Sequence, residues 1–251
     1  MPACPCVCCP DRLYFCALTR LPAETSTSHF FCIDDTLRYE PFFSDYGPLN
    51  LNLTYKFCQM LIGKLNAAEH AKKQIYFYCF NRPQNRSNAA VLIGIYLMVY
   101  GGRSSAQAYE PLKALEPYLP FRDASQGLCT FRLLPQHCLR AVGKALKLGW
   151  LNFDTWNSAE YEHFESVENG DLNIICPKKF LAFSGPHATN VSPDGYPTLS
   201  TEDIAATDLS SVNWDEAYEC ALHADSILLL LLRCALLPVC CVPAPPSTRC
   251  W

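Results

Sequence analysis

The sequence contains no run of basic residues, and its 251 residues carry a formal net charge of −4. Chains that bind nucleic acid usually present a basic stripe, so we do not expect nucleic acid as a partner. Charged residues make up only 18% of the chain and apolar residues 50%, which is enough for a globular core. At about 150 residues per domain, the length allows one large domain or one and a half ordinary ones.

The first ten residues have neither the cationic start nor the apolar stretch of a secretory signal peptide. We therefore expect an intracellular, reduced chain whose 16 cysteines stay as thiols. Four of them lie in ACPCVCCP, among prolines and without a second pair at zinc-finger spacing. We expect residues 1–10 to be a disordered Cys/Pro-rich start, and we expect no metal and no cofactor.

The stretch 75–96 predicts a strand, a polar loop and a buried helix in succession. Residues 75–78 are β-branched or aromatic, as is typical of a buried strand. An apolar segment follows Asn88, which is a good helix N-cap, and residues 89–96 have the composition of a buried helix. A strand that leads through a short loop into a helix N-terminus favours the binding of an anion.

The loop between this strand and helix holds Cys79, Arg82 and Arg86. Cysteine-dependent phosphatases need a thiolate and an arginine separated by five residues, so that both reach one phosphate. Six residues lie between Cys79 and Arg86, and no histidine precedes the cysteine. We interpret the segment as a degenerate phosphate-type loop without the chemistry. The alternative is an ordinary strand–loop–helix connection with solvated arginines.

A second cysteine, Cys138, follows His137 as in a phosphatase signature. Lys144 rather than arginine stands six positions later, within residues that favour a helix. We interpret Cys138 as a core residue beside a surface histidine. Other strands are expected over 11–18, 29–33, 172–176 and 179–183, and other helices from Pro48, from Ser104 to about Leu115, and over about 134–145.

Residues 148–177 contain no lysine or arginine, although acidic residues are frequent there. Ser158 is expected to cap a helix that runs to Glu168. On this helix Glu162, Glu165 and Glu168 follow one another at spacings of three, with no cation in the helix to offset their repulsion. Two interpretations remain open: a binding site for basic peptide segments, or a face that serves solubility alone.

Several long motifs now point to one family, and they occur in the order RLYFCAL, HFFCID, DYGPLNL, CFNRPQNRSNAAVLIGIYL, LPFRDAS, EYEHFESVENGDLN and KFLAFSGPH. Over about residues 11–197 the chain resembles the dual-specificity protein phosphatases of the cell division cycle 14 family. The resemblance implies two phosphatase-like domains in tandem, joined by a linker helix. The first domain is non-catalytic and helps to shape the substrate groove, and the second carries the nucleophilic cysteine, the phosphate-binding arginine and the general-acid aspartate.

The resemblance also implies the fold, an α/β protein-tyrosine-phosphatase-like sheet flanked by helices, then a linker helix and the first strands of a second, incomplete phosphatase-like domain. The implied divisions are 11–152 for the non-catalytic domain, 153–170 for the acidic linker helix, 171–199 for the start of the catalytic domain, and 200–251 for a divergent tail. Glu162, Glu165 and Asp171 match acidic positions that line the groove for a basic substrate residue.

The family's substrates are phosphoproteins, chiefly at phosphoserine-proline sites followed by a basic residue, and its pathway is mitotic exit and cytokinesis. The resemblance therefore implies such segments as partners, and a location in the nucleus, nucleolus and cytoplasm, with the spindle pole or centrosome as a further site.

The resemblance stops near Leu199, and the His-Cys-x5-Arg signature does not appear. We therefore expect no catalytic residues and a truncated, non-catalytic substrate-recognition fragment. One alternative is an active protein-tyrosine phosphatase that uses Cys79 with Arg82 or Arg86. Another is a membrane-attached interaction protein anchored through 227–242, although this apolar segment is shorter than the ~20 residues of a spanning helix.

Overall fold

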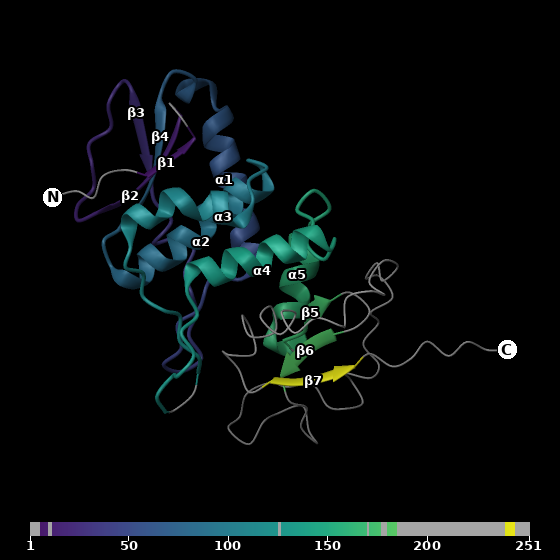
Figure 1. The fold of residues 1–251 in the computed structure, drawn as a ribbon. Coiled ribbons are helices and arrows are strands. Elements are labelled where there is room, and N and C mark those ends of the chain that lie inside the picture. Colours follow the sequence, from purple (N-terminus) through teal and green to yellow (C-terminus); the bar gives the residue numbers. More distant parts are fainter. Residues whose placement is uncertain are drawn as a thin grey trace. The chain divides into compact units, whose positions relative to one another are not determined.

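The computed structural model describes six parts of the chain, namely residues 6–9, 12–124, 127–169, 171–176, 180–184 and 239–243. The chain divides into two compact units, 1–146 and 147–251. The first unit contains a four-stranded sheet and several helices, and the second contains a helix and a three-stranded sheet (Figure 1). The chain is thus a mixed α/β protein, as the sequence predicted.

The sheet of the first unit has the strand order β1-β2-β4-β3. Its strands are β1 (Cys6–Cys9), β2 (Leu13–Leu18), β3 (Ser28–Phe31) and β4 (Gln74–Phe80). β2 and β3 lie parallel to β4, whereas β1 is antiparallel to β2, with Cys6 opposite Phe15. The expectation of a disordered start is therefore wrong for residues 6–9, because their backbone pairs with the otherwise open edge of β2.

The helices of the first unit are α1 (Leu51–Asn66), η1 (Ala68–His70), α2 (Pro83–Val99), α3 (Ser105–Tyr109), η2 (Glu110–Leu115) and α4 (Pro135–Lys147). α1 begins later than the expected Pro48, because the Asn50 side chain accepts a hydrogen bond from the Leu53 N–H at 2.8 Å and caps the helix. Ser104 is confirmed as the N-cap of α3, in a capping box with Gln107.

The prediction that Asn88 begins the central helix is wrong, because α2 begins at Pro83 and has Arg82 as its N-cap. Proline suits the first helical position, where its fixed φ is helical and its missing N–H costs nothing. The polar residues after Pro83 therefore form the first turns of the helix rather than a loop. α2 ends at Val99, and Gly102 follows with a φ of 63°, a backbone conformation that favours glycine after a helix.

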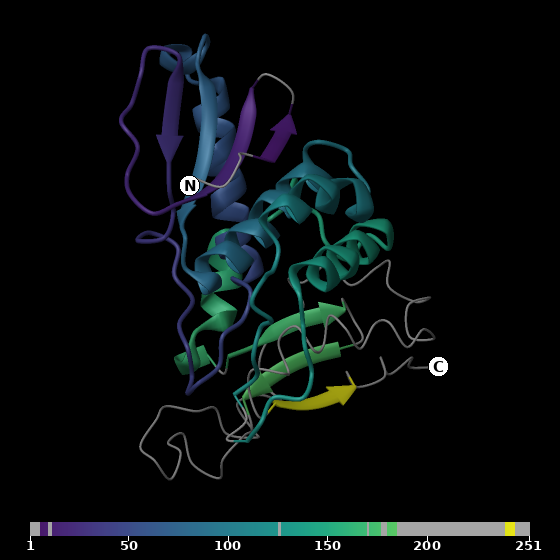
Figure 2. The same ribbon diagram turned by 60° about the vertical axis from the view of Figure 1, so that its left-hand side comes forward.

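Phenylalanines form the core between the sheet and α1. Phe77 of β4 is fully buried, and its ring lies 5.4 Å from Phe15 of β2 and 5.3 Å from Phe31 of β3. On the helix side, the ring of Phe57 in α1 lies 4.8 Å from that of Phe77. α1 therefore covers one face of the sheet, as Figure 2 shows. This packing fixes β4, the strand that leads into the predicted phosphate-type loop.

α2 is buried along most of its length and packs closely against α4. A Cβ atom added at Gly94 of α2 would lie 2.6 Å from the side chain of Leu139 in α4. Only glycine allows the two helices to approach this far without a shift of Leu139. The predicted α4 is confirmed, and Cys138 is buried within it, as expected for a core residue.

The second unit contains α5 (Ser158–Glu165), η3 (Val167–Asn169), and a sheet of β5 (Asn173–Cys176), β6 (Phe180–Ser184) and β7 (Val239–Pro243) in that order. The expected cap is one residue off, because Asn157 rather than Ser158 accepts the hydrogen bond from the Glu160 N–H. The α-helix also ends at Glu165 instead of Glu168, since Ser166 is extended.

β7 comes from the segment expected to be a divergent tail, and it pairs antiparallel with β6. Of the apolar segment 227–242, residues 227–238 lie outside the described residues, and 239–242 belong to β7. In the part of the chain that the structure describes, no helix is both long and apolar enough to span a bilayer.

Candidate functional site

The predicted phosphate-type loop lies between the end of β4 and the start of α2. Cys79, the second last residue of β4, is fully buried and stands opposite Ala17 of β2. Burial raises the pKa of the Cys79 thiol well above its usual value, and the negative charge of Asp34 raises it further, against a smaller lowering by Arg86. The thiolate is the nucleophilic form, so this cysteine is held in its unreactive form.

The two arginines predicted to lie in the loop are the N-cap of α2 and a residue of its second turn, and they make different contacts. Arg82 is exposed at the N-cap of α2. Arg86, one turn further along, is half-buried and donates a hydrogen bond from Nη2 to the Pro117 carbonyl oxygen at 2.8 Å. The structure therefore brings Cys79, Arg82 and Arg86 to one strand–helix junction, but it uses Arg86 to hold a neighbouring segment of the chain.

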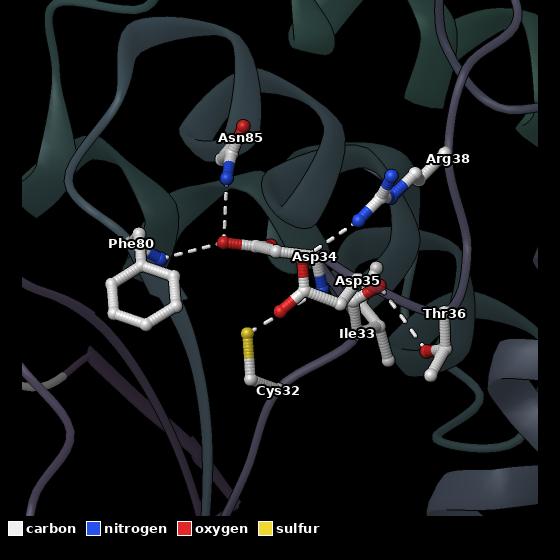
Figure 3. A network of polar contacts seen from close by, with 8 residues as sticks. All are labelled: Cys32, Ile33, Asp34, Asp35, Thr36, Arg38, Phe80 and Asn85. Carbon is white, nitrogen blue, oxygen red and sulfur yellow. Dashed lines mark hydrogen bonds and ion pairs between the residues drawn. The ribbon is translucent and has the colours of Figure 1, made fainter.

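Sequence reasoning missed Asp34, which lies just after β3 and supplies the negative charge in this loop. Its Oδ2 accepts hydrogen bonds from the Phe80 N–H at 2.7 Å and from Asn85 Nδ2 at 2.5 Å (Figure 3). β3 and β4 are parallel neighbours, so residues that follow the two strands meet at one edge of the sheet. Parallel pairing of the two strands was the signal that could have predicted a contact of Asp34 with Phe80 and Asn85.

The His-Cys-x5-Arg signature is absent, but the bare spacing of cysteine and arginine occurs at Cys32 with Arg38 and at Cys6 with Arg12. Spacing alone therefore does not exclude a phosphate loop. At Cys32, burial raises the thiol pKa to about 11. Arg38 is exposed and forms an ion pair with Asp35 at 3.0 Å, and no helix begins in this loop. These features do not form a phosphate-binding loop.

The other pair, Cys6 and Arg12, lies across the turn between β1 and β2. The Arg12 guanidinium donates hydrogen bonds to the backbone oxygens of Leu65 at 2.8 Å, His70 at 2.7 Å and Ala71 at 3.2 Å. These carbonyls belong to the end of α1 and to the η1 turn, where unpaired oxygens need donors. Arg12 is thus a structural residue that holds the end of α1 against β2.

The acidic residues predicted to bind a basic segment gather at the end of α5. Glu162 and Glu165 lie in the last turn of this helix. The chain then turns back, because the Asp171 N–H donates to the Ser166 oxygen at 3.0 Å and the Leu172 N–H to the Phe164 oxygen at 2.6 Å. This turn places the backbone of Asp171, which has a φ of 50°, directly beside the residue that follows Glu165.

Hydrogen bonds orient the carboxylates of Glu165 and Asp171. Tyr161 donates to Glu165 Oε1 at 3.5 Å, and Asn173 Nδ2 donates to Asp171 Oδ1 at 3.2 Å. The C-terminal end of a helix carries a partial negative charge, which disfavours carboxylates and favours cations. The end of α5 therefore combines this backbone charge with three acidic side chains, in a stretch whose sequence from 148 to 177 supplies no lysine or arginine.

A family model described as dual specificity protein phosphatase, N-terminal half, matches residues 7–145. The chain belongs to the CDC14 family of dual specificity protein phosphatases. It is similar to the dual specificity protein phosphatase CDC14A of Homo sapiens, with 46% identity over 195 residues, 76% of this chain and 33% of that protein. It is 32% identical over 186 residues to the tyrosine-protein phosphatase CDC14 of Saccharomyces cerevisiae, which covers 74% of this chain and 33% of that protein.

A third relative, the tyrosine-protein phosphatase cdc-14 of Caenorhabditis elegans, is 36% identical over 201 residues, 75% of this chain and 28% of that protein. The chain therefore spans about a third of the length of these CDC14 phosphatases. The family model runs from β1 to α4, so the β4–α2 loop lies within the segment that defines the N-terminal half of the family.

Proposed function

We propose that this chain is a non-catalytic substrate-recognition part of a CDC14-type dual specificity phosphatase, which binds phosphoserine-proline segments through a basic residue that follows the proline. The role belongs to mitotic exit and cytokinesis, inside the cell, with the nucleus, nucleolus, cytoplasm and spindle pole as its sites. The observation that carries the proposal is the junction of β4 and α2, where the Cys79 thiol is fully buried and Arg86 donates to the Pro117 carbonyl oxygen.

The chemistry of cysteine-dependent phosphate hydrolysis argues against catalysis at this junction. The reaction needs a thiolate aimed at phosphorus and a guanidinium that holds the phosphoryl oxygens. Cys79 is fully buried, and Arg86 donates to the Pro117 carbonyl. The nearby Asp34 carboxylate would also repel a phosphate dianion. Each of these three features opposes the reaction independently.

The end of α5 supports recognition of a cation. Glu162 and Glu165 lie in the last turn of α5 and Asp171 follows it, at a helix end where the dipole adds a partial negative charge. A lysine or arginine placed there would gain from all of these charges at once. Because the site is on the surface, we expect each ion pair to contribute only about 0.2–1 kcal/mol and to weaken with added salt.

The expected absence of phosphatase activity is tested by measuring phosphate release from para-nitrophenyl phosphate with the purified full chain. We expect the wild-type chain and a double variant with Cys32→Ser and Cys79→Ser to release phosphate at the same background rate. A rate that is above background and is lost in the double variant would overturn this part of the proposal.

Recognition is tested separately, by fluorescence anisotropy with a labelled phosphoserine-proline peptide that carries a lysine after the proline, and with the same peptide carrying alanine there. We expect the lysine peptide to bind more tightly, and the preference to vanish in Glu162→Gln/Glu165→Gln. Glu40→Gln, a change at an exposed carboxylate of the first unit, is the matched control and should keep the preference. Equal binding of both peptides to the wild-type chain would contradict the role.

A further inference from the structure

Asp34 makes the contacts with the β4–α2 loop that a bound oxyanion would be expected to make. One oxygen atom, Oδ2, accepts hydrogen bonds from both the Phe80 N–H and the Asn85 side chain (Figure 3). Phe80 is the last residue of β4, and Asn85 lies in the first turn of α2. A single carboxylate oxygen thus joins the strand end to the helix start, as an anion held in a strand–loop–helix cradle does.

The surroundings of this oxygen favour negative charge. α2 has 17 residues, and its N-cap residue Arg82 provides no side-chain hydrogen bond to the first turn. The partial positive charge at the start of such a long helix is therefore not offset by a cap. Arg86 Nε is also buried without a hydrogen-bond partner. The junction has the charge of an anion site, and the Asp34 carboxylate is in contact with it.

We propose that Asp34 is the resident anion of the β4–α2 loop, which would otherwise hold a small oxyanion or carboxylate. Asp34 follows β3 by three residues and precedes Phe80 by 46, so its carboxylate also ties the segment after β3 to the junction. While Asp34 is in place, inorganic phosphate is excluded by occupancy and by charge. When its side chain is truncated, the loop accepts formate, acetate or phosphate from solution. This holds whether or not α5 binds a peptide.

The neighbouring Asp35 provides a matched control. It is exposed and forms an ion pair with Arg38, three residues away, at 3.0 Å. Asp35→Ala also removes one carboxylate, at the adjacent position, but it leaves the hydrogen bonds of Asp34 to Phe80 and Asn85 in place. Asp34→Asn is the second comparison, because the amide fills the same space and keeps an oxygen acceptor but carries no charge.

The test compares thermal unfolding of the full chain in sodium chloride with unfolding in sodium formate and in sodium phosphate at equal ionic strength. We expect Asp34→Ala to unfold about 5 °C or more below the wild type in chloride, since charge-assisted hydrogen bonds are lost. Formate or phosphate should restore a large part of that shift in Asp34→Ala. The same salts should have no specific effect on the wild type, on Asp34→Asn or on Asp35→Ala.

A second measurement uses the folded wild-type chain and so does not depend on any variant. In amide NMR spectra, we expect added phosphate to leave the Phe80 and Asn85 signals unmoved. The proposal is overturned if phosphate shifts these signals with saturation in the wild type. It is also overturned if Asp34→Ala folds and shows no greater response to formate and phosphate than Asp35→Ala does.

Discussion

Two junctions of this protein place carboxylates at helix ends, and they use them in opposite ways. At the start of α2, Asp34 meets hydrogen-bond donors from Phe80 and Asn85, so its charge is satisfied within the fold. At the end of α5, Glu162 and Glu165 sit in the last turn, where the carbonyl groups of the helix add to their negative charge. We propose that the first arrangement closes a site and that the second attracts cations from outside.

The comparison indicates that the donors within reach decide what a carboxylate does. The donors to Asp34 are the Phe80 N–H and the Asn85 side-chain amide, whereas a helix C-terminus supplies carbonyl oxygens, which cannot satisfy a carboxylate. We propose that one internal aspartate closes the β4–α2 junction to phosphate, and that the other unit keeps a surface for basic peptides.

The largest effect is expected from Phe77→Ala, which would loosen the strand that carries the closed junction. Phe77 is fully buried against Phe15, Phe31 and Phe57, so its truncation should cost about 3–5 kcal/mol in the free energy of unfolding. Urea unfolding measures this loss. Phe43→Ala, at a side chain with 58% exposure, should change stability by only about 0.5 kcal/mol or less. Equal losses for the two variants would contradict the assigned core.

A charge reversal at the other junction should have the next largest effect. Glu162→Lys/Glu165→Lys replaces attraction by repulsion, so we expect affinity for the lysine-containing phosphopeptide to fall by about tenfold, two ion pairs at up to ~1 kcal/mol each. Anisotropy titrations at low and high salt measure the change, which should shrink as salt screens it. A loss of affinity that does not depend on salt would indicate that the helix had unfolded instead.

A third carboxylate, Glu24, faces a histidine instead of neutral donors, and this pair makes the stability of the fold depend on pH. Glu24 contacts His29 Nδ1 at 2.6 Å, while Lys64 lies 3.2 Å from Nε2 and the His70 ring stacks at 3.9 Å. Burial, then the charges of His70 and Lys64, lower the pKa of His29 below its usual 6.5.

Because the unfolded chain then binds this proton more readily, the free energy of unfolding should fall as the pH drops below about 6.5. Lys73 and Glu69 also face this cluster, since Lys73 Nζ lies 3.8 Å from Glu24 Oε2 and Glu69 Oε1 lies 3.4 Å from His70 Nε2. Urea midpoints at pH 7.5 and 5.5 measure the trend, and His29→Gln should flatten it. A wild-type midpoint that rises on acidification would show that the sign is wrong.

The smallest effect is expected for Arg82→Ala. This arginine is exposed at the N-cap of α2 and provides no side-chain cap, so its removal should change the unfolding free energy by about 0.5 kcal/mol or less. Thermal unfolding measures it. A loss as large as that of Asp34→Ala would mean that Arg82 holds the junction together as strongly as Asp34 does.

The sequence predicted local features well wherever a local pattern decides them. β4 was predicted from its aromatic and β-branched residues, and the helix that begins after Ser104 was predicted with serine, a good N-cap residue, at its start. The start of α2 was placed at Asn88 instead of Pro83, because polar residues in the first helical turns look like a loop. A proline at the first helical position was the signal that would have corrected it.

The candidate sites were predictable only in part. The segment with Cys79, Arg82 and Arg86 could be located from local sequence. The acidic residues of α5 could be singled out because residues 148–177 contain no lysine or arginine. Asp34 could not be assigned its role, because its contacts are with residues on the next strand and helix. Such a contact depends on strand order, which local patterns do not determine.

The most direct test of the contrast between the two junctions is one amide NMR experiment on the wild-type chain with two ligands. Inorganic phosphate should leave Phe80 and Asn85 unmoved, while a phosphoserine-proline peptide with a lysine should shift Glu162, Glu165 and Asp171. Phosphate that shifts Phe80, together with a lysine peptide that leaves the end of α5 unmoved, would contradict the account at both junctions.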